Sequence, residues 1–185
     1  MTEIEHLDLE RRRRIRKLYS FGDFQLALSA AAFLGECEAD EKYTKAELRR
    51  FRCYETTVII SYARPFSQSS HGFPKLSLKM VGATLTEEQI ALHDRLLMMR
   101  NKVIAHSDAD MMRMTSQADP MEFDDDFKFV LLQTVFDEGM TFIGSEFWKL
   151  NELLHVVHSS LYANLLKEAQ VLTSEFNVRK DHLRR

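Results

Sequence analysis

Residues 145–176 read SEFWKLNELLHVVHSSLYANLLKEAQVLTSEF and form the strongest structural signal in the chain. Apolar side chains recur through this stretch every three or four positions, the spacing of one face of an α-helix. The stripe consists of Phe147, Leu150, Leu154, Val157, Leu161, Leu165 and Leu172. The pattern predicts one long C-terminal helix whose apolar face must be covered by other helices.

A second helix is predicted to begin at Thr86 and to stop near residues 105–107. Gln89 stands three residues after Thr86, so that the two side chains form a capping box at the start of the helix. The apolar stripe again keeps helical spacing, at Leu92, Leu96, Met99 and Val103.

A third helix is predicted from Thr44, with Glu47 completing its capping box and Pro65 ending it. Glu55 lies on the apolar stripe of this helix, so we expect a partly buried carboxylate there. The partners considered for that carboxylate are Arg100 and Arg64, because a charge on an apolar face is expected to be paired.

The N-terminal part of the chain predicts two helices, over residues 2–19 and 21–38. The first has an acidic first half and a basic second half, which matches the polarity of the helix dipole. The second has an alanine-rich centre that allows a neighbouring helix to approach closely.

Two polar segments separate the predicted helices. Residues 65–85 have the prolines, glycine and serines of a loop, and residues 107–126 are polar and acidic. Within and after the second segment, residues 111–115 and 127–136 are predicted to pair as a small β-hairpin. The predicted fold is therefore all-α, an up-and-down helical bundle with a small hairpin inserted before the long C-terminal helix.

Length and composition indicate a single domain, residues 1–178, followed by a basic tail, residues 179–185. The 185 residues are 45% apolar and 29% charged, with a net charge of −3, so the chain is neither disordered nor a general nucleic-acid coat. Two cysteines, Cys37 and Cys53, are too few for a disulfide framework and are expected to be buried thiols. The N-terminus has no signal-peptide pattern and no apolar run is long enough to span a bilayer, so we expect a cytoplasmic protein without a membrane contact.

The segment RNKVIAHSD, residues 100–108, carries the chemistry of interest. Arginine offers a planar fork to phosphate oxygens, and histidine transfers protons near neutral pH. Six helical steps put Arg100 and His106 roughly 120° apart on an unbroken helix. The two side chains therefore reach one phosphate only if the helix unwinds before His106, or if two chains face each other across a twofold axis.

Arg100-Asn101-x4-His106 resembles the signature of the HEPN superfamily (higher eukaryotes and prokaryotes nucleotide-binding). The longer string RNKVIAHSD is similar to the abortive-infection branch of that superfamily. The segment SYARPF, residues 61–66, is also familiar from such helical proteins, with lower specificity. The motif covers about nine residues, and the compatible helical layout covers most of the chain.

The resemblance implies a homodimer joined through the motif helix, and a ribonuclease that needs neither a metal nor another cofactor. Arg100 would bind the scissile phosphate, Asn101 would orient Arg100 or the phosphate, and His106 would transfer the proton. RNA would be cut by attack of a 2′-hydroxyl, giving a 2′,3′-cyclic phosphate and a 5′-hydroxyl end. The residues predicted to contact the substrate around this centre are Arg64, Lys102, Ser107 and Asp108.

Alternatives to this interpretation remain open. Asp108 stands where one toxin subgroup carries a tyrosine that a partner enzyme modifies, so that form of regulation is not supported, although an antitoxin or another protein partner is still expected. Some HEPN-like proteins are non-catalytic modules that bind a protein or a nucleotide. Arg64 could equally cap the end of its helix, and Lys102 could be a solvated surface residue.

Two further patterns favour structural roles. The basic run Arg11 to Lys17 could hold RNA, but pairing with the acids upstream is the preferred interpretation. Glu152 and His155 have the Glu-x-x-His spacing of di-iron bundles, but the second such motif that those sites require is missing from the sequence, so no metal site is predicted.

Overall fold

The computed structural model describes residues 8–68, 72–101, 114–122, 128–136 and 139–172. The described part of the chain is mostly helical and contains one two-stranded antiparallel sheet. In chain order the elements are α1 (Leu9–Leu34), α2 (Lys45–Ala63), the 3₁₀ turn η2 (Arg64–Phe66), α3 (Leu78–Val81), α4 (Glu87–Met99), β1 (Met114–Glu122), β2 (Lys128–Phe136) and α5 (Ser145–Val171).

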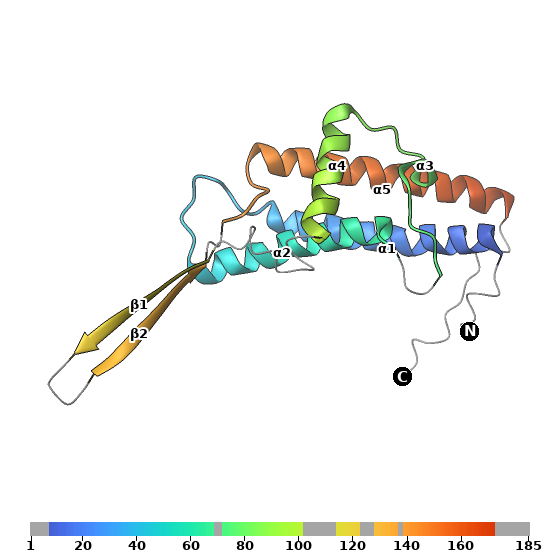
Figure 1. Cartoon of the computed structure of the whole chain (residues 1–185). Coiled ribbons are helices and arrows are strands. Elements are labelled where there is room, and N and C mark those ends of the chain that lie inside the picture. The colour runs from blue at the N-terminus through green and yellow to red at the C-terminus, as the bar shows by residue number, and fades with distance from the viewer. Residues whose placement is uncertain (1–7, 69–71, 102–113, 123–127, 137–138, 173–185) are drawn as a thin grey trace, which may run out of the picture.

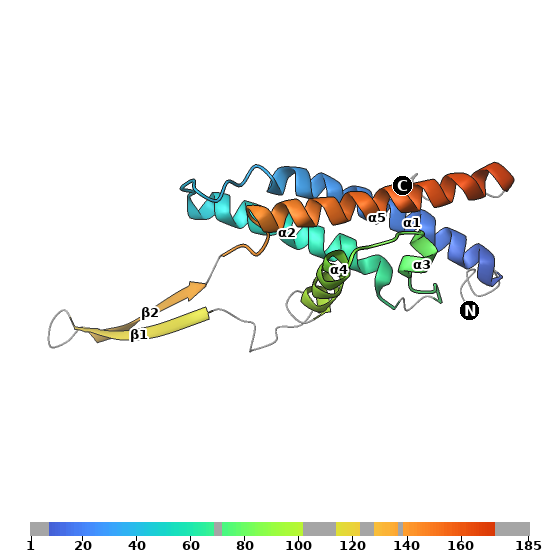
Figure 2. The same cartoon turned by 90° about the horizontal axis from the view of Figure 1, so that it is seen from above.

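Three long helices run side by side and a fourth crosses them. In Figures 1 and 2, α1 runs antiparallel to both α2 and α5, and it packs against both helices. Helix α4 crosses this group steeply and so interrupts the simple alternation of an up-and-down bundle. The β1–β2 hairpin projects away from the helices, beyond the start of α2 (Figure 1). The predicted class, a helical bundle with a small hairpin before the last helix, is confirmed.

The capping signals predicted two helix starts correctly. Thr44 and Glu47 form a complete capping box at α2, and Thr86 and Gln89 do so at α4. In each case the threonine hydroxyl accepts from the third backbone N–H of the helix while the longer side chain accepts from the N–H of the threonine. The predicted C-terminal helix is α5, which begins at Ser145 as expected.

The N-terminal helices were predicted wrongly, because α1 is continuous from Leu9 to Leu34. The expected break at Ser20 does not occur: the Ser20 hydroxyl donates to the carbonyl of Arg16 one turn earlier, at 2.7 Å, and so stays inside the helix. The buried residues also keep one phase through the expected break, at Arg16, Ser20, Phe24, Ala27, Ala31 and Leu34. A continuous stripe packs against α2 and α5 only if the helix is continuous.

The first strand of the hairpin lies later in the chain than predicted. β1 spans Met114–Glu122 and pairs with β2 in the register Ala118 to Leu132, whereas residues 111–115 were expected to form that strand. β1 is polar and contains Pro120, so its sequence lacks the apolar alternation by which a strand is recognised. The expected loop 65–85 likewise contains the short helix α3, which Ser77 caps and Gly82 ends with a φ of 77°.

Large side chains fill the core between α1, α2, α4 and α5. Phe24, Tyr62, Leu96 and Leu150 are all at most 1% exposed. The predicted burial of both thiols is wrong for Cys53, which is exposed, while Cys37 is half-buried. Among the described helices, none combines the length and apolar content that a bilayer span requires.

Candidate functional site at the end of helix α4

The apolar face of α4 determines where Arg100 lies. Leu92, Leu96 and Met99 are buried against the core, and Arg100 follows as the C-cap residue, half-buried at the edge of that face. Its backbone N–H donates to the carbonyls of Leu96 and Leu97. At Arg100 and Asn101 the backbone takes the wider turn of a π-helix, a feature often found at functional positions.

The side chains of Arg100 and Asn101 are hydrogen-bonded to each other. Nη1 of Arg100 donates to Oδ1 of Asn101 at 2.9 Å. This contact restricts the rotation of the guanidinium, and among the described residues no second hydrogen bond of the Arg100 side chain is found. The structure thus brings together two of the three residues that the sequence predicted for catalysis.

A pocket of about 380 Å³ adjoins this pair. A second cation, Lys75, lies on its wall, and its ammonium makes no hydrogen bond or ion pair with any described residue. The remaining lining is an aromatic ring, an aliphatic side chain and polar groups, contributed by Phe66, Ser67, Gln68 and Leu97. Two cations beside one pocket are suited to bind a phosphate group.

Arg16, a buried residue of α1, holds the wall of this pocket in place. Its Nη2 donates to the carbonyls of Arg64 at 3.0 Å, of Pro65, and of Ser67 at 3.2 Å. Burial lowers the pKa of Arg16, and the nearby carboxylate of Asp23 acts in the opposite direction. The carbonyls of Arg64 and Pro65 also accept from the backbone N–H groups of Ser67 and Leu76, so the guanidinium adds a second donor to these two carbonyls and joins all three in one place.

The same corner also fixes the position of Lys75. The backbone N–H of Leu76 donates to the carbonyl of Pro65 at 2.8 Å, and Leu76 is 2% exposed. Residues 66–68 and residue 75 are therefore tied to one point of the fold. Sequence reasoning missed both Arg16 and Lys75; Arg16 could have been found because it is in phase with the buried stripe of α1.

Behind the pocket wall lies a buried polar pair, Tyr62 and His93. The Tyr62 hydroxyl and Nδ1 of His93 are 2.8 Å apart, and the ring of Phe66 packs edge-on against His93 with centroids 4.6 Å apart. Burial lowers the pKa of His93, while Asp94 acts to raise it, and burial raises the pKa of Tyr62. Both groups are therefore neutral near pH 7 and support Phe66 from the core side.

Arg64 does not line this pocket; it faces α1 instead. Its Nη1 donates to Oδ1 of Asp23 at 2.8 Å, and its side chain is 52% exposed. Burial raises the pKa of Asp23, and the charges of Arg64 and Arg16 lower it. Arg64 as a substrate contact stays a prediction. The predicted positions His106, Lys102, Ser107 and Asp108 lie outside the described residues.

The predicted partners of Glu55 are wrong. Glu55 is 1% exposed, as its place on the stripe indicated, but its carboxylate accepts from Nη1 of Arg52 at 2.7 Å and from two backbone N–H groups. Those groups belong to Thr141, at 2.6 Å, and Phe142, at 2.8 Å. The carboxylate therefore fixes the chain between β2 and α5 and contacts neither Arg100 nor Arg64.

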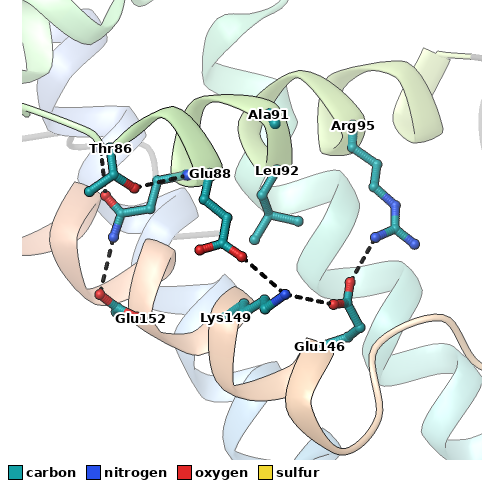
Figure 3. A pocket seen from close by; sticks show the side chains of 9 residues that line it. Thr86, Glu88, Ala91, Leu92, Arg95, Glu146, Lys149 and Glu152 are labelled. Atoms are coloured by element: carbon teal, nitrogen blue, oxygen red, sulfur yellow. Dashed lines mark hydrogen bonds and ion pairs between the residues drawn. The ribbon is translucent and has the colours of Figure 1, made fainter.

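A second pocket, of about 340 Å³, lies between α4 and α5 (Figure 3). Its charges are paired with each other: Arg95 donates to Glu146 at 2.9 Å, and Lys149 lies between Glu146 and Glu88. Hydrogen bonds from Arg95 and Lys149 lower the pKa of Glu146. The network joins the two helices across a solvated cleft.

Several residues of the basic run of α1 form ion pairs or hydrogen bonds within the fold. Arg13 pairs with Glu10, Arg12 donates to the carbonyl of Gly72 at 3.3 Å, and Lys17 contacts Glu168 of α5. Pairing with an upstream acid is therefore one of several contacts, and Asp8 caps the start of α1 by accepting from the backbone N–H of Arg11 at 2.8 Å.

The residues around the Glu-x-x-His spacing contact other helices of the fold. Glu152 accepts from Gln89 at 3.2 Å, and His158, three residues after His155 on the same helix, stacks on Phe21 with centroids 4.7 Å apart. Within the described residues, no three His, Cys, Asp or Glu side chains are grouped as metal ligands would be.

No protein-family model matches this chain, and no curated protein and no solved structure is significantly similar to it.

Proposed function

We propose that the chain is an endoribonuclease of the HEPN type that cleaves RNA without a metal ion. The observation that carries the proposal is the guanidinium of Arg100, oriented by Asn101 at 2.9 Å, in a pocket that also holds Lys75. A backbone phosphate in that pocket would receive two positive charges, one of them from a planar fork suited to phosphate oxygens.

The proposed reaction is an internal transesterification. The 2′-hydroxyl attacks the adjacent phosphorus, a base accepts its proton, and the bond from phosphorus to the 5′-oxygen breaks as that oxygen is protonated. The products are a 2′,3′-cyclic phosphate and a 5′-hydroxyl end. Arg100 stabilises the additional negative charge on the phosphate, and His106 transfers the proton.

A second copy of the chain belongs to this proposal. Two chains that meet through the ends of α4 would place two copies of the motif around one RNA strand, as a twofold contact requires. We further propose that the protein acts in the cytoplasm as a toxin or defence protein, with an antitoxin or similar protein as its partner. Lys102, Ser107 and Asp108 are proposed to contact the RNA next to His106.

The test is cleavage of a broad RNA panel by the purified protein in EDTA. The variants are Arg100→Ala, Asn101→Ala and His106→Ala, with Arg95→Ala as the matched control. Arg95 lies on the same helix, but its guanidinium pairs with Glu146. Equal thermal unfolding of all variants by circular dichroism shows that the fold is retained.

We expect loss of Arg100 or His106 to slow cleavage by roughly 10² to 10⁴-fold, while Arg95→Ala cleaves as the wild type does. Cleavage that survives both substitutions would overturn the assignment. A folded protein that cuts no RNA in the panel would favour a non-catalytic module that binds a protein or nucleotide.

A further inference from the structure

A third pocket, of about 570 Å³, lies between the first half of α1, the short helix α3 and the C-terminal end of α5. Figures 1 and 2 show α3 beside the C-terminal half of α5. We call this space the α3 pocket. It shares no lining residue with the pocket at the end of α4. Its volume is within the range of sites that bind small molecules.

One side chain of α5 connects the walls of the α3 pocket. Oδ1 of Asn164 accepts from Nζ of Lys17 in α1 at 3.3 Å, and its Nδ2 donates to the carbonyl of Met80 in α3 at 3.4 Å. Gly82 ends α3 with a φ of 77°, and a Cβ atom added there would lie 3.2 Å from Nδ2 of Asn164. Glycine therefore permits both this turn and the close approach of α3 to α5. The walls of the pocket are thus held in place by contacts within the chain.

The lining of the α3 pocket carries an excess of positive charge. Its charged residues are four cations and two carboxylates: Arg13, Arg14, Lys17, Lys79, Glu10 and Glu168. Glu10 pairs with Arg13, and Glu168 pairs with Lys17. The pocket therefore has a net charge of two positive units and is suited to an anion.

Lys79 and Ser77 supply donors to the α3 pocket that the fold does not use. Lys79 is exposed, and its ammonium makes no hydrogen bond or ion pair with any residue that the structure describes. The Ser77 hydroxyl accepts from the backbone N–H of Met80 at 3.2 Å and donates to none of the described residues. A hydroxyl that accepts in this way can still donate its own hydrogen to an anion. Met80 and Leu172 add apolar surface to the same pocket.

We propose that the α3 pocket binds a small molecule through a phosphomonoester group, which Lys79 and Ser77 contact. A phosphomonoester carries about 1.5 to 2 negative charges at pH 7, which matches the net charge of the pocket. A phosphodiester, the group that links the nucleotides of RNA, carries one. Charge balance thus favours a free phosphorylated molecule over an RNA strand. The proposal does not depend on the proposed ribonuclease activity.

The test compares methyl phosphate, a monoester, with dimethyl phosphate, a diester, as the two probes. Each probe is titrated into the isotope-labelled full chain at constant ionic strength near neutral pH, and the amide shifts are followed by NMR. The amides of residues 77–80 report the α3 pocket, and those of Arg100 and Asn101 report the pocket at the end of α4. Binding to the two pockets is therefore measured separately.

The variants for this test are Lys79→Gln, which removes a charge from the pocket, and Lys79→Arg, which keeps it. Lys42→Gln is the matched control, because Lys42 is also exposed but does not line the pocket. Thermal unfolding followed by circular dichroism shows that each variant keeps the wild-type fold.

We expect methyl phosphate to give saturable shifts at residues 77–80 and to bind there more tightly than dimethyl phosphate. Lys79→Gln should weaken this binding roughly tenfold, because a hydrogen bond between two charged groups is lost. Lys79→Arg and Lys42→Gln should retain most of the affinity. The proposal would be overturned by the absence of saturable shifts at residues 77–80, by an affinity for the diester as high as for the monoester, or by equal losses in Lys42→Gln and Lys79→Gln.

Discussion

Glu55 of α2 accepts a hydrogen bond from the backbone N–H of Phe142 at 2.8 Å, although the two residues are 87 positions apart in the chain. The carboxylate is buried, and Phe142 is fully buried beside it. The contact anchors the segment that leads from the hairpin into α5. One side chain thus determines where the hairpin leaves the helical body and where the longest helix begins.

Replacing Glu55 with glutamine should lower the free energy of unfolding by about 2 kcal/mol. Glutamine retains one carbonyl oxygen, but it loses the charge that strengthens the hydrogen bonds from Thr141, Phe142 and Arg52. Urea unfolding followed by circular dichroism measures the change. Glu41→Gln, at an exposed position, is the control and should change stability by less than about 0.5 kcal/mol. A Glu55→Gln protein as stable as the control would refute the anchoring role.

Arg16→Met should destabilise the fold by about 2 to 3 kcal/mol, because it leaves the carbonyls of Arg64, Pro65 and Ser67 without their shared donor. Methionine keeps most of the side-chain volume, so the loss reports hydrogen bonding more than packing. Arg13→Met, a change on the partly exposed face of the same helix, should cost less than about 1 kcal/mol. Chemical unfolding measures the free energy of unfolding of both variants. A similar loss of stability in the two would contradict the role of Arg16.

Stability should fall as the pH is lowered through the range just below the ordinary histidine pKa of about 6.5. The pKa of His93 is lowered in the folded protein, so the unfolded chain binds the proton first and protonation favours unfolding. The loss begins near the ordinary pKa and ends below the lowered one. His158 contributes in the same direction, because burial lowers its pKa too.

The measurement that isolates His93 is urea unfolding between pH 5 and pH 7 for the wild type and for His93→Gln. One proton changes the free energy of unfolding by at most about 1.4 kcal/mol per pH unit. We expect a shallower pH dependence in the variant. Identical slopes in the two proteins would show that His93 does not titrate in this way.

Lys75→Gln should weaken RNA binding while the stability of the fold is unchanged. The ammonium of Lys75 lines the pocket beside Arg100 and has no partner among the described residues, so its loss removes one phosphate contact. The slope of log affinity against log salt should fall by about 0.7 for a single-stranded RNA. Fluorescence anisotropy at several salt concentrations measures it, with Lys79→Gln as the control. An unchanged slope would show that Lys75 does not contact an RNA phosphate.

The parts of this fold that could be predicted from sequence are those encoded by neighbouring residues. The capping boxes at Thr44 and Thr86 involve side chains three residues apart, so the starts of α2 and α4 were predicted correctly. The stripe of α5 is equally local. The break expected near Ser20 was wrong because packing against two other helices outweighs the weak helix propensity of serine and glycine there.

The candidate site also combines residues that are neighbours in the sequence with residues that only the fold brings together. Arg100 and Asn101 are adjacent in sequence, so their hydrogen bond was within reach of a motif argument. Lys75 reaches the pocket only through the hydrogen bond between Leu76 and Pro65, and Arg16 reaches it from another helix. Such long-range partners, like those of Glu55, depend on how the helices pack, which a single sequence does not encode locally.

The measurement that tests the central claim most directly uses an RNA that the wild-type protein cuts, compared with the same RNA carrying one 2′-O-methyl group at the cleaved position. The proposed reaction needs the 2′-hydroxyl as its nucleophile, so we expect cleavage at that position to disappear in EDTA while neighbouring positions are still cut. Cleavage that continues at the methylated position would contradict the proposed mechanism, because the nucleophile would then have to be another group.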